Sequence, residues 1–166
     1  MVMKILNQQI FKNKEAAALP GLMESGGLPA LVSGLSAIHR ANLAAALYER
    51  LELPIIVVCP DDSSADSFAR DLEAMTGVAV NTLYSREFTF YNSLAASRET
   101  EQKRLSIFNA LKRGQSPLTV ATVSSLMQRT IPPHTLDEAA FTVTDGTSCP
   151  PEELESALIR CGRVFS

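Results

Sequence analysis

The chain has 166 residues, of which 46% are hydrophobic and 20% are charged, and its formal net charge is −3. This composition supports a folded core, and it excludes both a disordered chain and a strongly basic surface for duplex nucleic acid. No apolar stretch approaches the roughly 18 residues of a membrane span, and the first residues lack the apolar region of a signal peptide. Three cysteines without close spacing argue against a disulfide framework or a zinc site. We therefore predict a soluble, cytoplasmic protein.

Apolar runs and helical patterns alternate along the chain, which predicts an α/β protein with a parallel, doubly wound sheet. The uniformly apolar "PIIVVCP" predicts a strand that is covered on both faces. The predicted elements, in chain order, are a helix that ends near Pro20-Gly21, a strand at 29–34, a helix at 36–51, strands at 54–60 and 78–84 around a helix at 61–77, a helix at 97–114, a strand at 117–123, a short helix at 124–133, a strand at 138–146 and a helix at 149–162.

The segment "RTIPPHTLDE" (129–138), with its two prolines, is the candidate domain boundary. Only one predicted strand and one predicted helix follow it, which is too little for a domain. The last residues, "GRVFS", begin a further strand pattern. We therefore expect a chain that is cut within its second domain.

The stretch "LVSGLSAIHRANLAAAL" (31–47) has the setting of a phosphate loop, which requires G-x-x-x-x-G-K-[ST] between a strand and a helix. Aligned on Gly34, the second glycine is His39, the lysine is Arg40 and the hydroxyl residue is Ala41. A Cβ at the second glycine hinders the backbone from curling around phosphate, and alanine cannot bind Mg²⁺. Two interpretations stay open: a degenerate phosphate loop, or an ordinary strand-to-helix turn.

We predict no catalytic, cofactor or metal site at the acidic segment 136–141 or at the two histidines. The acids of "LDEAAF" (136–141) precede an apolar run, whereas a Walker B acid follows one, so we assign this segment to a loop. The two histidines, His39 and His134, have no acid or cysteine at ligand spacing.

The aromatic segment "REFTFY" (86–91) offers a further alternative, because aromatic rings near Arg98 and Arg104 can bind single-stranded nucleic acid. The favoured interpretation is that these rings pack a loop onto the sheet. The helix that follows carries mixed charges, such as Glu99 and Lys103 at i,i+4, which indicates a solvated helix face.

Several segments resemble the N-terminal region of the bacterial transcription-repair coupling factors (Mfd). They are "FYN" (90–92), "SRETEQKRL" (97–105) and "VSSLMQRTIPP" (123–133), of which "SLMQRTIPP" is the most specific. The resemblance covers about residues 15–166. One departure is Asn92, where the family often has aspartate.

The resemblance implies a RecA-like, degenerate helicase domain similar to UvrB, with residues 1–133 as domain 1a and residues 134–166 as the truncated beginning of the UvrA-binding domain 2. It implies a non-catalytic adaptor that helps to recruit UvrA to stalled RNA polymerase in transcription-coupled nucleotide excision repair. The UvrA-contacting residues are expected beyond Ser166.

The resemblance also implies that ATP, Mg²⁺, DNA and RNA polymerase are bound by other parts of a parent DNA translocase, and that this chain holds no cofactor of its own. Two alternatives remain: a nucleotide-binding domain with an atypical loop, and a single-strand nucleic-acid-binding module.

Overall fold

The computed structural model describes residues 7–85, 94–115, 117–139 and 150–160. The chain forms two compact units, Met1–Gln128 and Arg129–Ser166. The division falls at the first residue of the proline-containing segment 129–138. No helix in the described ranges is both long and apolar enough to cross a membrane.

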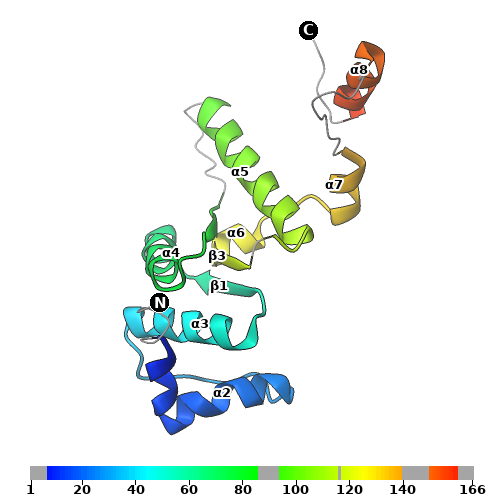
Figure 1. The fold of residues 1–166 in the computed structure, drawn as a ribbon. Coiled ribbons are helices and arrows are strands. Elements are labelled where there is room, and N and C mark those ends of the chain that lie inside the picture. The colour runs from blue at the N-terminus through cyan, green and yellow to red at the C-terminus, as the bar shows by residue number, and fades with distance from the viewer. Residues whose placement is uncertain (1–6, 86–93, 116, 140–149, 161–166) are drawn as a thin grey trace. The chain divides into compact units, whose positions relative to one another are not determined.

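The first unit alternates helices and strands (Figure 1). Its elements are the 3-10 helix η1 (Gln9–Lys12), α2 (Lys14–Glu24), α3 (Ala37–Leu51), β1 (Ile55–Cys59), α4 (Asp62–Thr76), β2 (Asn81–Leu83), α5 (Leu94–Lys112), β3 (Leu118–Thr122) and α6 (Val123–Met127). The described part of the second unit contains α7 (Pro133–Ala139) and α8 (Pro151–Arg160).

The three strands form a parallel sheet in the order β1-β3-β2, which confirms the predicted parallel α/β class. The connection from β1 runs past the position of β3 to reach β2, and the connection from β2 returns to the centre. Because parallel crossovers are right-handed, this reversal of direction is expected to place the two connecting helices on opposite faces. Residues 118 and 120 of β3 point to one face, and residues 119 and 121 point to the other.

The packing agrees with this expectation. On one face, Leu118 and Val120 of β3 pack with α4, whose Leu72 also contacts Ala45 of α3. On the other face, Ala121 packs with Ile107 of α5. The core therefore has two layers, one on each face of the sheet. Helices α3 and α4 cover one face, and α5 covers the other.

Strand β1 is open on the α5 side of the sheet, which corrects the expectation that it is covered on both faces. Ile56 is 57% exposed and Val58 is 51% exposed. They pair in register with Thr119 and Ala121 of β3. The described part of α5 packs on β2 and β3, so it leaves this face of β1 uncovered.

The predicted helix signals are present at both ends of α4. The side chain of Asp61 accepts a hydrogen bond from the backbone N–H of Ser64 at 2.8 Å, and Gly77 ends the helix with φ +69°. The predicted ion pair on α5 is also confirmed, since Lys103 Nζ lies 2.9 Å from a carboxylate oxygen of Glu99.

Three local predictions were wrong. Helix α2 does not stop at Pro20-Gly21 but continues to Glu24. Pro20 cannot donate a backbone hydrogen bond, but its ring is buried, and this packing offsets the loss of that bond. Residues 29–34 form no strand, because an apolar run becomes a strand only where it pairs, and they have no ladder partner among the described residues.

The third correction concerns "LDEAAF". Residues 136–139 lie in helix α7 rather than in a loop or in the predicted strand at 138–146. Pro133 begins this helix, where its missing N–H costs nothing. Residues 140–149 lie outside the described residues.

Candidate functional site

The segment that resembles a phosphate loop ends at the N-terminus of α3. Gly34 has φ +78° and open space where a Cβ would lie. Ser36 is the N-cap of α3, but its hydroxyl lies 2.8 Å from Nδ1 of His39 and makes no cap hydrogen bond to the backbone. His39 and Arg40 are exposed, whereas Ala41 is fully buried.

This geometry differs from a phosphate loop in its setting as well as in its residues. The predicted strand before the loop is absent, and Leu31 within that run is 95% exposed. The side chain of Ala41 faces the core and has no hydroxyl for a metal ion. The expected strand–loop–helix frame is therefore wrong, and only the helix that follows it is present.

The N-terminus of α3 lies near the carboxyl end of β1. Burial raises the pKa of the Cys59 thiol, the neighbouring Asp61 raises it further, and Arg40 lowers it. The pKa of Asp61 itself is lowered, first by the backbone N–H of Ser64 and then by the hydroxyl of Ser64. Arg40 and Asp61 thus place opposite charges at the carboxyl edge of the sheet, where ligands bind in open α/β folds.

A buried arginine occupies another part of this edge. Arg104 of α5 is 1% exposed, and its Nη1 donates to the backbone carbonyl of Tyr84 at 2.5 Å. Its Nη2 lies 3.5 Å from the carbonyl oxygen of Ser125, and its guanidinium lies 5.5 Å from the centre of the Phe108 ring. Arg104 therefore connects the chain after β2 to the chain after β3.

Ser125, the first residue of "SLMQRTIPP" (125–133), has a structural role at the end of β3. Thr122 and Ser125 form a capping box, in which the backbone N–H of each donates to the hydroxyl of the other, at 3.1 and 3.2 Å. The hydroxyl of Ser125 also donates to the carbonyl of Thr122 at 2.8 Å, and both residues are fully buried. These hydroxyls stabilise the turn from β3 into α6.

Tyr84 connects the end of β2 to α4 as well as to α5. Its hydroxyl donates to the carboxylate of Asp66. Burial raises the pKa of Tyr84, and the hydrogen bond and negative charge of Asp66 raise it further. The carboxyl edge is thus held together by contacts among the chain's own groups.

The two arginines of the nucleic-acid alternative, Arg98 and Arg104, both belong to α5. Arg104 is buried, so it does not lie on a surface that nucleic acid could reach, which corrects the part of the single-strand nucleic-acid hypothesis that used Arg104. Arg98 lies in α5, and the aromatic segment 86–91 lies outside the described residues. The described ranges contain no group of three or more histidine, cysteine, aspartate or glutamate side chains that could hold a metal ion.

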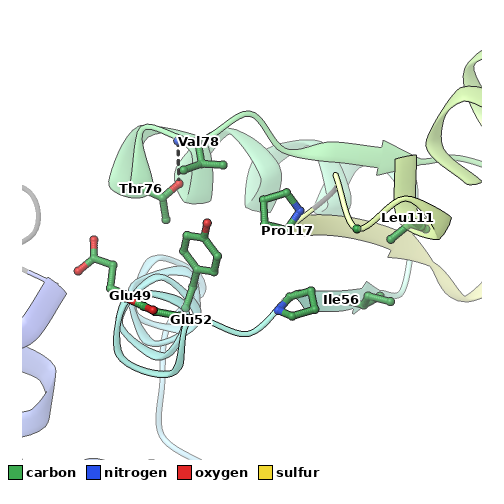
Figure 2. Close-up of a pocket in the computed structure, with 10 residues that line it drawn as sticks. Glu49, Glu52, Ile56, Thr76, Val78, Leu111 and Pro117 are labelled. Atoms are coloured by element: carbon green, nitrogen blue, oxygen red, sulfur yellow. Dashed lines mark hydrogen bonds between the residues drawn. The ribbon is translucent and has the colours of Figure 1, made fainter. Parts of the chain in front are cut away.

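A pocket that no sequence pattern predicted opens at the amino edge of the sheet. Its volume is about 720 Å³, and it lies among the C-terminus of α3, the residues after α4 and the residues before β1 and β3. Figure 2 shows Glu49 and Glu52 at one end, and Ile56, Leu111 and Pro117 toward the other.

The fold and these sites define a protein with a small parallel α/β domain. No family model and no solved structure matches the chain. The chain is similar to the transcription-repair-coupling factor of Bacillus subtilis (strain 168), with 26% identity over 133 residues. The matched region is 80% of this chain and 11% of that protein, so the chain spans about a ninth of the length of this relative.

Proposed function

We propose that the chain is a non-catalytic adaptor region related to transcription-repair-coupling factor. Residues 1–133 would form a degenerate, UvrB-like and RecA-like domain, and residues 134–166 would begin the UvrA-binding domain. The single observation that carries this proposal is the similarity over 133 residues to the Bacillus subtilis factor. In the proposal, the adaptor helps to recruit UvrA to stalled RNA polymerase, and other parts of the parent protein bind ATP, Mg²⁺ and DNA.

Three structural features support an adaptor over a nucleotide-binding enzyme. The segment at Gly34 lacks the preceding strand, and Ala41 is buried without a hydroxyl. At the carboxyl edge, the hydroxyls of Thr122 and Ser125 are used in a capping box. We infer that the described part of this edge lacks the groups that transfer a phosphoryl group, and we propose that the domain acts by binding a protein.

Calorimetric titration of UvrA tests the adaptor role. It compares this chain with a longer polypeptide that continues through the complete second domain. Binding by the longer chain alone supports the proposal and places the contact surface beyond Ser166. Failure of both chains to bind UvrA overturns the recruiting role.

Titration of Mg-ATP into the same chain tests the enzyme alternative. The adaptor proposal expects no heat of binding, in wild type and in Arg40→Ala alike. ATP binding that Arg40→Ala abolishes would instead favour a nucleotide-binding domain with an atypical loop.

A further inference from the structure

The connection between α2 and α3 carries apolar side chains that the described fold leaves in solvent. Leu28, Leu31 and Val32 are all exposed, and Leu31 almost completely so. Within the described ranges, the backbone of residues 28–35 makes no hydrogen bond to another part of the chain. An apolar segment with unused backbone donors and acceptors is suited to pair with the edge of a sheet.

Strand β1 has a complementary deficit on the edge that faces away from β3. The N–H of Ile55 donates to the carbonyl of Pro117 at 2.8 Å, and backbone groups alternate in direction along a parallel strand. The backbone groups of Ile56 and Val58 therefore point to the other edge, where the described residues supply no strand. The side chains of the same two residues are more than half exposed. An added strand would satisfy this edge and partly cover these side chains.

The handedness of the crossovers assigns the segment before α3 to this edge. Helix α4 leads from β1 toward β2, and α3 lies on the same face as α4, since Ala45 and Leu72 share one cluster with Leu118 of β3. Parallel crossovers are right-handed, so two helices on one face carry the chain in the same direction across the sheet. A parallel strand that leads through α3 into β1 must therefore lie on the side of β1 away from β3.

Residues 29–34 have the features of an edge strand followed by a short turn. Only Leu35 and Ser36 separate the segment from α3, and loops of two to six residues are common in α/β units. Gly34 has φ +78°, a conformation that lets the chain turn. Pro29 would be the first residue of the strand, a position that proline tolerates.

We propose that residues 29–34 are a switchable edge strand that pairs in parallel with β1 in a second state of this chain. The sheet order in that state is 29–34, β1, β3, β2. The segment then occupies the edge of β1 and excludes other strands from it, whereas the described state leaves the edge open. The pairing does not change the missing hydroxyl at Ala41, so it restores no phosphate site. It also does not rest on the proposed binding of UvrA.

Amide hydrogen exchange of the full chain, followed by NMR, tests this proposal. The described state gives residues 30–33 no backbone partner within the described ranges, so their amides should exchange as in an unstructured peptide of the same sequence. If the second state is populated, alternate amides in this segment should exchange at least about tenfold more slowly than in that peptide. The amides of Ile56 and Val58 should be protected by the same pairing.

Two substitutions test whether the segment and β1 protect each other. Leu31→Asp, at an exposed residue, should speed exchange at Ile56 and Val58 at least about threefold and leave the core amide of Val120 unchanged. Val58→Lys should speed exchange within residues 30–33 to the same extent. Ile159→Lys is the control, because it places the same charge at a similarly exposed residue of α8, and it should change neither segment.

Exchange of residues 30–33 at the rate of the free peptide would overturn the proposal. Slow exchange in this segment that neither substitution changes would overturn it as well, because the segment would then be protected by something other than β1.

The Leu31→Asp variant decides the result if Val58→Lys does not fold, since Leu31 contributes nothing to the packing of the described state. Unchanged exchange at Ile56 and Val58 in this variant would then contradict the pairing.

Discussion

At the carboxyl edge of the sheet, described side chains bond to the backbone and to one another, whereas a pocket of about 720 Å³ opens at the amino edge. At the carboxyl edge, Arg104 and the capping box of Thr122 and Ser125 satisfy the backbone groups that follow β2 and β3. At the amino edge, Glu49 and Glu52 face a hollow with no basic residue among its described lining.

Fold class alone does not locate a binding site in this domain. Open α/β sheets bind ligands at the carboxyl ends of their strands. Here Arg104, Thr122 and Ser125 at that edge are committed to structure, and the described pocket lies at the opposite edge. Substitution of these bonded groups is therefore expected to lower stability, whereas substitution of Glu52 at the amino edge is not.

The largest expected effect follows from Arg104→Ala. This change removes the bonds to the carbonyls of Tyr84 and Ser125 and the contact with the Phe108 ring, and it leaves buried carbonyls without these donors. We expect the free energy of unfolding to fall by about 2–4 kcal/mol, measured by urea denaturation. Arg113→Ala, which removes an exposed arginine just after the same helix, should stay within about 0.5 kcal/mol of wild type.

A second substitution at the same residue separates the effect of packing from that of hydrogen bonding. Arg104→Met keeps most of the buried volume without the hydrogen bonds. Full stability in Arg104→Met would show that the bonds of the guanidinium contribute nothing net and that only packing matters at this edge.

The next effect in size concerns the capping box. Ser125→Ala removes a buried hydroxyl that accepts from Thr122 N–H at 3.1 Å and donates to the Thr122 carbonyl at 2.8 Å. The expected loss of stability is about 1–2 kcal/mol in the same denaturation experiment. Ser124→Ala is the control, because the hydroxyl of Ser124 lies 3.1 Å from that of Thr122 but takes no part in the two backbone bonds of the box. It should cost less than half as much. An equal loss in the two variants would contradict a specific role for the box.

Two helix ends at the amino edge, Glu52 and Gly77, share a positive φ but differ in residue type. Glu52→Gly should raise the free energy of unfolding by about 0.5–1 kcal/mol, because glycine tolerates φ +54°. Gly77→Ala should lower it by about 1 kcal/mol through conformation alone, since a Cβ there meets open space. Thermal unfolding measures both. A loss of stability in Glu52→Gly would mean that the carboxylate itself stabilises the fold.

The smallest effect is the pH dependence at Asp61. Its hydrogen bonds to Ser64 lower the pKa of the folded state below the ordinary value of 3.8. Its contribution to stability is therefore present above that value and is lost as the pH falls through the folded-state pKa. The stability difference between wild type and Asp61→Asn should be constant from about pH 7 to 5 and should shrink at lower pH. A difference that grows on acidification would contradict this assignment.

Local signals in the sequence predicted much of the secondary structure. Helix α4 follows from its cap at Asp61 and its glycine at position 77, and both signals act within a few residues of the helix ends. The apolar runs at β1 and β3 predicted parallel strands. The same kind of signal failed at 29–34, because pairing with a distant partner, and not the apolar run itself, makes a strand.

The amino-acid sequence alone shows which groups of a phosphate loop are missing, since His39, Arg40 and Ala41 stand where the motif has glycine, lysine and a hydroxyl residue. Only the tertiary structure determined which polar and charged side chains form hydrogen bonds with distant parts of the chain. Arg104 meets a carbonyl 20 residues away, and Asn7 meets Glu49 across 42 residues. The amino-edge pocket is likewise lined by residues from Tyr48 to Pro117. Such contacts depend on how strands and helices pack, and no short sequence pattern encodes them.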